Sequence, residues 1–281
     1  RSSAQQYFHT FCGVLRVLML FVAGVVVVAI LLGKSPLTLF AGLGATSAVL
    51  MLVFKDTITG LASGVRLTSN DMLHKGDWIT VKSVDANGIV EEMSLTTVKV
   101  RNFDNTIVTI SPTTLVNGSF QNWIGMQNSG GRRVKRLVYF DFRSIRLVDD
   151  LLKQKLISKH FATEDSFKLK ESLQKALEKD RQEGKDIEDL KNPAALAPTN
   201  LQLYRKFMEK YLRQRPEINT ELTLMVRHLE ATQCGLPIEF YFFIKDKVWV
   251  NYEHILADIM EHAYALANEF ELKIYEQYPE Q

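Results

Sequence analysis

The sequence predicts a multi-domain membrane protein in which transmembrane α-helices precede a small β-barrel domain and an α+β domain, both cytoplasmic. Three observations lead to this prediction. Two long apolar segments stand near the N-terminus, short alternating strands follow them, and a mixed helix and strand pattern fills the remainder. The expected boundaries are 1–68 for the transmembrane region, 69–128 for the β domain and 129–281 for the α+β domain.

The composition limits the functions that the chain could have. Its 281 residues are enough for two or three domains, and 34 basic residues nearly balance 32 acidic ones. This balance gives no support for a nucleic-acid partner, which would favour a basic surface. The two cysteines, Cys12 and Cys234, provide neither a disulfide framework nor a metal site.

The first apolar segment, 11–32, has the length and composition of a membrane span. A helix of roughly 20 residues crosses the hydrocarbon core of a bilayer. The only charge inside the segment is Arg16, which lies near its start and can reach the interface. A signal peptide would have a shorter apolar region and a cleavage site, whereas this segment leads into a second apolar one.

The second apolar segment, 37–54, differs from the first in the size of its side chains. It follows a tight turn in which Ser35 can cap a helix and Pro36 suits the first helical position. Small residues let helix backbones approach closely in lipid. An ordinary helix pair within one chain needs only one small face, whereas a closed ring of copies needs two faces and a third toward its axis. The small residues on several sides of this segment include Ala41, Gly42, Gly44, Ala45 and Ala48.

After the second span the pattern becomes amphipathic over residues 55–68. Ile58 and Leu61 fall on one helical face, and charged or polar residues fall off it. Such a helix suits the membrane surface. We therefore expect a bend near Lys55 and Asp56, where the chain would pass from spanning the membrane to lying along it.

The distribution of basic residues predicts the orientation. Arg1 and Arg16 flank the start of the first span, and Lys55 and Arg66 follow the second, whereas the intervening turn carries only Lys34. Because basic residues are enriched on the cytoplasmic side, both ends of this region should be cytoplasmic.

The β domain is predicted from alternation of apolar and polar residues. The clearest signal is a pair of alternating runs on either side of Asp104 and Asn105, which is typical of a β-hairpin. Several short strands within about fifty residues suggest a small barrel. The expected strands are 78–81, 88–93, 97–101 and 106–110.

The remainder predicts an α+β domain with a helical insertion. We expect strands at 137–142, 221–229, 238–244 and 272–275, and helices at 145–157 and 252–270. The segment 161–215 carries many charges of both signs and is interpreted as the insertion. Its two helices are predicted from apolar residues at helical spacing, namely Leu169, Leu173 and Leu177, then Leu203, Phe207 and Tyr211.

No pattern of catalytic residues stands out. The sequence has no phosphate-binding loop, no zinc-type cysteine spacing and no His-Glu-x-x-His motif. His254 and His262 fall on one predicted helix but two turns apart, too far to share a metal ion. We therefore predict no enzyme activity, no metal and no cofactor.

The residues from about 39 to 123 resemble the pore helix and β domain of the bacterial small-conductance mechanosensitive channel (MscS-like) family. The resemblance covers about a third of the chain, and its parts occur in the family's order. The long segment 161–215 and the stretch 130–133 resemble the YbdG-type miniconductance subgroup, which implies further N-terminal spans. The matching runs are 52–64, 75–79, 88–90, 97–101, 104–105 and 115–117.

The resemblance implies an Sm-like β domain and a homo-oligomer, a heptamer, in the bacterial inner membrane. The second span would line the pore, and the α+β domains would enclose a cytoplasmic vestibule. The other partners would be membrane lipids and permeating ions.

The same resemblance implies roles for individual residues. Ala48 and Leu52 fall where the family has its two apolar constrictions, with Ala45 and Met51 also lining the pore. Ala48 is smaller than the leucine of the family, so Leu52 would carry most of the closed seal.

The kink and its surroundings also depart from the family pattern. Lys55 and Asp56 stand where the family usually has glycine. Together with Gly60 and Gly64 they would form the hinge and couple it to the β domain. Ala41, Gly42 and Gly44 would allow close packing between neighbouring helices.

The expected function is an ion channel opened by membrane tension, which releases ions and small solutes on hypo-osmotic shock. The alternative is a membrane-anchored osmotic sensor or scaffold with little conductance, whose contact surface would be the charged insertion 161–215. A solute transporter fits poorly, because it would normally show internal repeats and polar residues at the membrane midplane.

Overall fold

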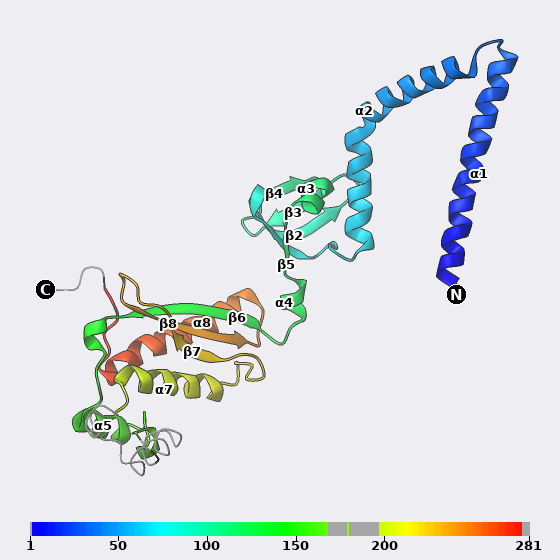
Figure 1. Cartoon of the computed structure of the whole chain (residues 1–281). Coiled ribbons are helices and arrows are strands. Elements are labelled where there is room, and N and C mark those ends of the chain that lie inside the picture. The colour runs from blue at the N-terminus through cyan, green and yellow to red at the C-terminus, as the bar shows by residue number, and fades with distance from the viewer. Residues whose placement is uncertain (1, 168–178, 180–196, 277–281) are drawn as a thin grey trace. The chain divides into compact units, whose positions relative to one another are not determined.

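The computed structural model describes residues 2–167, 179 and 197–276, and it divides into two compact units. The first unit is Arg1–Trp123 and the second is Ile124–Gln281 (Figure 1). The division after Trp123 lies close to the boundary of 128 expected from the sequence. The predicted leucine repeat at 169–177 lies outside the described residues.

Two long helices open the first unit. They are α1 (Ser2–Leu31) and α2 (Pro36–Ser69), and both are long and apolar enough to cross a membrane. The turn between them has the predicted chemistry. The side chain of Ser35 accepts a hydrogen bond from the amide of Thr38 at 3.2 Å, and Pro36 is the first residue of α2.

The segments 37–54 and 55–68, expected as two helices, form one continuous helix, α2. Figure 1 shows that its ribbon bends partway along. Neither Lys55 nor Asp56 interrupts the backbone, because neither lacks an amide proton and neither has the freedom of glycine. The hydroxyl of Thr59 donates to the carbonyl of Lys55 at 2.8 Å, a side-chain hydrogen bond of the kind that often bends helices.

The β domain is a five-stranded antiparallel sheet with the strand order β4-β3-β2-β1-β5. The predicted hairpin is confirmed as β3 and β4, and Asn105 in its turn has a left-handed φ of 68°. Short helices at the connections are η1 (Lys82–Val84) and α3 (Pro112–Asn117). The strands are β1 (Trp78–Val81), β2 (Ala86–Met93), β3 (Val98–Asn102), β4 (Ile107–Ile110) and β5 (Gln121–Asn122).

The core of this domain includes the end of α2. Leu67 of α2 is fully buried with Leu73, Ile79 and Val100, among other apolar residues of the sheet. The strands alternate because one face of the sheet covers this core. The membrane helix and the β domain therefore share one hydrophobic core.

The second unit is a two-layer α+β sandwich. Its antiparallel sheet has the order β6-β8-β7, and the helices α7 and α8 pack on one face of it. Tyr204 of α7 donates from its hydroxyl to the carbonyl of Ala263 of α8 at 2.6 Å. The strands are β6 (Arg132–Phe140), β7 (Met225–His228) and β8 (Leu236–Ile244). The helices are α4 (Ile124–Asn128), η2 (Phe142–Ser144), α5 (Asp150–Ser158), η3 (Glu164–Phe167), α7 (Asn200–Gln214), α8 (Trp249–Ala267) and η5 (Asn268–Phe270).

Helix α7 corrects the expectation that 161–215 is wholly an insertion. Leu201, Tyr204, Met208 and Leu212 of this helix are buried in the core of the second unit. Of the predicted apolar face, Leu203 is buried in that core, whereas Phe207 and Tyr211 are only partly buried against it. The exposed side of α7 is basic, and for this reason the sequence pattern resembled a solvated insertion and not a core helix.

Two other elements differ from expectation. The last predicted strand, 272–275, is only an isolated bridge between Phe140 and Ile274, because no further pairing extends it within the described residues. The helix expected from 145 begins at Asp150, since Asp149 caps it by accepting from the amide of Leu152 at 2.9 Å.

Candidate functional site

The first half of α2 presents the predicted pore residues along one side of the helix. Ala41, Ala45, Ala48 and Leu52 follow the spacing i, i+4, i+7 and i+11, which keeps residues on one helical face. Met51 precedes Leu52 and therefore lies about 100° around the helix from it. Leu52 is 75% exposed and Met51 is 69% exposed in the single chain.

Gly42 and Gly44 flank this face on nearly opposite sides of the helix, because two positions correspond to about 200° of rotation. No described atom outside the helix lies within 4 Å of the place that a Cβ would take at either glycine. Thr46 satisfies its hydroxyl within the helix by donating to the carbonyl of Gly42 at 2.9 Å. The surface beside the face is therefore flat and unoccupied in one copy.

Lys55 and Asp56 continue the same side of α2 beyond Leu52. Lying three and four positions further on, they are within about 60° of the Leu52 direction. Both are exposed, and no ion pair is recorded for either in the described structure. They form a charged turn of the helix directly after the apolar residues of the predicted pore face.

Gly64 makes the contact that joins α2 to the sheet. A Cβ added at Gly64 would lie 2.6 Å from the carbonyl oxygen of Leu95, closer than real Cβ contacts. Leu95 belongs to the turn between β2 and β3, which Ser94 and Thr97 close by mutual hydrogen bonds. Only glycine allows this approach of two backbones. Gly60, by contrast, has no such described neighbour.

Asp77 fixes the chain as it enters the β domain. Its buried carboxylate accepts from the amide of His74 at 3.0 Å and from the side chain of Asn122 in β5 at 2.8 Å. Asn122 also donates to the carbonyl of Met72, which follows α2 closely. The end of the membrane helix is thus tied to strand β5 and to the residue that precedes β1.

The sequence had not singled out Leu67, Leu95 or Asn122 for these contacts. Leu95 and Asn122 are far from α2 in the sequence and belong to a turn and a two-residue strand. Only the apolar pattern of 55–68 could have pointed to Leu67 as a core residue.

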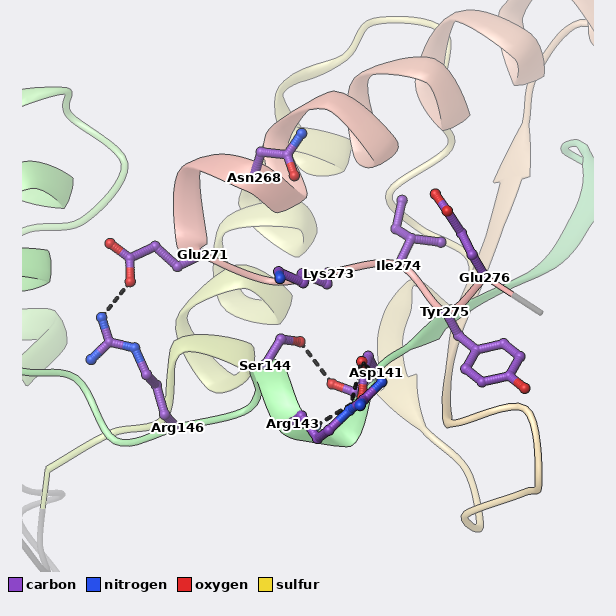
Figure 2. Close-up of a pocket in the computed structure, with 10 residues that line it drawn as sticks. All are labelled: Asp141, Arg143, Ser144, Arg146, Asn268, Glu271, Lys273, Ile274, Tyr275 and Glu276. Atoms are coloured by element: carbon purple, nitrogen blue, oxygen red, sulfur yellow. Dashed lines mark hydrogen bonds and ion pairs between the residues drawn. The ribbon is translucent and has the colours of Figure 1, made fainter. Parts of the chain in front are cut away.

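A pocket of about 940 Å³ opens on the second unit (Figure 2). Its charged side chains largely engage one another. Arg143 donates to both carboxylate oxygens of Asp141, and this guanidinium holds the pKa of the Asp141 carboxyl below its usual range. Arg146 binds Glu271 and Asp149. The pair of Arg146 and Glu271 ties the segment before α5 to the residues after α8.

No feature of the described ranges suggests metal or redox chemistry. No group of three or more His, Cys, Asp and Glu residues is placed to hold a metal ion. Cys12 and Cys234 are both exposed and unpaired thiols.

Comparison with known proteins assigns the region that contains this site. The family model described as the β domain of mechanosensitive ion channels matches residues 56–125, from within α2 to the end of the β domain. This part of the chain is MscS-like. The match includes Gly60, Gly64, the Leu95 turn and Asp77, so the MscS-like region coincides with the junction of helix and sheet.

Two relatives of this chain come from Methanocaldococcus jannaschii. The small-conductance mechanosensitive channel MscMJ is 34% identical over 84 residues, which are 30% of this chain and 23% of that protein. The large-conductance mechanosensitive channel MscMJLR is 29% identical over 105 residues, which are 37% of this chain and 28% of that protein. The matches therefore span less than a third of these relatives.

Solved structures extend the similarity of fold to nearly the whole chain. Arabidopsis thaliana MSL1 superposes with a TM-score of 0.58 at 12% identity, covering 98% of this chain and 79% of that one. Helicobacter pylori MscS in its closed state gives a TM-score of 0.54 at 13% identity, with coverages of 96% and 81%. Membrane helices, a β domain and an α+β domain are thus the shared architecture. The resemblance to the miniconductance subgroup stays a prediction.

Proposed function

We propose that this chain is one subunit of a homo-oligomeric ion channel that membrane tension opens. The observation that carries the proposal is the composition of α2. One membrane helix presents Ala45, Ala48 and Leu52 on an exposed face in its first half and enters the core of the MscS-like β domain with Leu67 in its second half.

The small residues of α2 fit a closed ring of copies. Gly42 and Gly44 lie on nearly opposite sides of the helix and leave room for a neighbour on each side. The face with Ala41, Ala45 and Ala48 then points to the axis. We propose seven copies, as the resemblance implies.

Leu52 is the proposed gate. A ring of exposed leucines at a narrow point excludes water, and ions do not cross a dry apolar constriction. Ala48 is too small to close the same pore alone, and Met51 lies to one side of the face. The charged turn at Lys55 and Asp56 would lie at the cytoplasmic mouth of the pore, where water can hydrate both residues.

Tension would act through the difference in membrane area between the closed and open states. A stimulus shifts the equilibrium between the closed and open states only as far as it favours one of them. Stretching the membrane favours the state that occupies the larger membrane area. Movement of the spans would reach the β domain at Gly64, where α2 touches the Leu95 turn. Lys55, Asp56 and Gly60 would form the hinge above that contact.

The proposed location is the bacterial inner membrane, crossed more than once, with the β domain and the second unit in the cytoplasm. The basic residues Arg16, Lys55 and Arg66 support this orientation. In this setting the channel would release ions and small solutes on hypo-osmotic shock.

Survival of hypo-osmotic shock tests the cellular role. Bacteria that lack their own mechanosensitive channels would express the full protein and be diluted into water, beside cells that carry an empty vector. We expect a marked gain in survival, with release of small solutes into the medium. Equal survival of both strains, with the protein present in the membrane, would argue against a role in solute release and favour a sensor or scaffold.

A further inference from the structure

One face of the sheet in the second unit is not covered by α7 or α8. The side chains of Val134, Val138, Phe240 and Val226 point into the core beneath α7 and α8. Because successive residues of a strand point to opposite faces, their neighbours form the other face. That face, here called the outer sheet face, consists of Arg133, Lys135, Leu137 and Tyr139 of β6, Pro237, Glu239, Tyr241 and Phe243 of β8, and Met225 and Arg227 of β7.

The outer sheet face has the composition of a protein interface. Tyrosine, phenylalanine, methionine and arginine are the residues enriched at such interfaces. Tyr241 and Phe243 meet edge to face with ring centres 5.9 Å apart, and the guanidinium of Arg133 lies 6.0 Å from the Tyr241 ring centre. Lys135 and Arg227 add exposed positive charge.

Glu239 gives an independent sign that this face is incomplete in a single chain. It is fully buried at the centre of β8, and its Oε2 accepts from the Nε of Arg227 at 2.7 Å. Its Oε1 has no hydrogen-bond partner, since the Nζ of Lys135 is 3.7 Å away. A buried acceptor without a donor is costly, and a covering surface that brings the exposed Lys135 ammonium closer could supply the donor.

The outer side of α8 is complementary to this face. Leu256, Ile259 and Ala263 of α8 are buried against the sheet, so the opposite side of the helix points away from it. That side carries Asp258 and Glu261, which are exposed and for which the described structure records no ion pair. It also carries the small residues Ala257 and Ala265 and the donors His254 and Tyr264.

The outer side of α7 does not suit the same partner. Lys206, Lys210 and Arg213 of α7 are exposed, so this side is basic like the outer sheet face. Like charges brought together at an interface oppose association. Charge therefore distinguishes α8 from α7 as the surface to be covered.

We infer that the outer sheet face of one copy packs against the outer side of α8 in the next copy. The inference rests on the proposed homo-oligomer. The two surfaces lie on opposite sides of one sandwich, as α8 and the outer face are separated by the sheet. A contact between two different surfaces of identical copies is head-to-tail, and it is the kind that closes into a ring.

Cross-linking of paired cysteines tests this contact in the full oligomer. Cys12→Ser and Cys234→Ser remove the native thiols. Lys135→Cys on the outer sheet face and Glu261→Cys on α8 are then introduced together and treated with a short bis-maleimide. We expect a ladder of covalent dimers, trimers and larger species on a denaturing gel, because every copy would be linked to the next.

The single-cysteine variants and a matched pair serve as controls. Lys135→Cys alone and Glu261→Cys alone should give no dimer, since a head-to-tail contact never places two copies of one residue together. Lys135→Cys combined with Lys206→Cys on α7 should give no ladder. Dimers from either single variant, or a stronger ladder from the α7 pair, would overturn the inference.

Native mass spectrometry of the same samples separates this inference from the proposed function. An intact oligomer that gives no ladder would overturn the α8 contact and leave the channel proposal standing. A monomer would overturn the oligomer on which both depend.

Charge reversal provides a second readout. Arg133→Glu with Lys135→Glu should reduce the ladder from a Tyr241→Cys and Ala257→Cys pair at least several-fold. Adding Asp258→Lys with Glu261→Lys in the same chain should restore it. Failure of the restored charges to recover the ladder, in a protein of unchanged thermal stability, would contradict charge pairing across this contact.

Discussion

At the scale of single residues, a comparison of Leu52 with Leu50 tests whether the gate lies on the predicted pore face of α2. They differ by two positions and therefore point about 200° apart on the helix. Leu52→Ser should wet the constriction and let ions leak, so cells that express it should grow slowly and retain less potassium. Leu50→Ser makes the same chemical change on the opposite side and should leave both properties unchanged. Equal effects of the two substitutions would contradict the assignment of Leu52 as the gate.

Gly64 and Gly60 form a similar pair at the junction with the β domain. Gly64→Ala brings a methyl group against the Leu95 carbonyl oxygen, and overpacking of this kind costs about 1 to 3 kcal/mol. Gly60→Ala meets no described neighbour outside the helix and should gain up to about 1 kcal/mol through better helix propensity. Thermal unfolding of the two variants in detergent should therefore shift in opposite directions. A more stable Gly64→Ala protein would contradict the close approach to Leu95.

At the scale of elements, Tyr204 reports on the pairing of α7 with α8. Tyr204→Phe removes the hydrogen bond to the Ala263 carbonyl and should lower the free energy of unfolding by about 1 kcal/mol. Burial raises the pKa of the Tyr204 phenol above its ordinary 10.0. The contribution of this phenol is therefore complete below pH 10.0 and falls as the pH rises above it, because the unfolded chain ionises first.

Thermal unfolding between pH 8 and pH 11 measures this dependence. The Tyr204→Phe protein should lose less stability than the unmodified protein across the alkaline part of that range. Tyr139→Phe, which alters a partly exposed tyrosine of β6, is the matched control and should behave like the unmodified protein. Parallel curves for all three proteins would show that burial of Tyr204 does not matter to alkaline stability.

Elements with a strong local pattern could be predicted from the sequence. Alternation located β1 to β4, and Ser35 with Pro36 marked the start of α2, because both signals lie within a few residues. Contacts between distant segments could not be predicted in this way. Nothing local to Gly64 points to Leu95, and nothing near Asp77 points to Asn122.

Helix α7 illustrates why composition alone misleads. Its exposed Lys206, Lys210 and Arg213 made 161–215 resemble a solvated insertion, whereas Tyr204 and Met208 belong to the core. Deleting 161–215 therefore cannot distinguish a scaffold from a channel, because it would remove a core helix of the second unit. A useful deletion must retain α7.

At the scale of the whole molecule, the chain combines a membrane region with the MscS-like β domain through one shared core. Leu67 belongs to both the membrane helix and the sheet, so displacement of α2 cannot leave the β domain unaffected. The central claim is that such displacement opens a pore when the membrane is stretched. The gate residues and the oligomer were predicted from small side chains and family resemblance, since a single chain contains no pore.

Recording from the purified protein in liposome patches under graded suction tests that claim most directly. The account predicts discrete currents whose open probability rises with suction, together with currents at rest in Leu52→Ser and unchanged gating in Leu50→Ser. Silence up to the suction at which the patch ruptures would contradict it. The same fold would then serve better as an osmotic sensor or scaffold than as a channel.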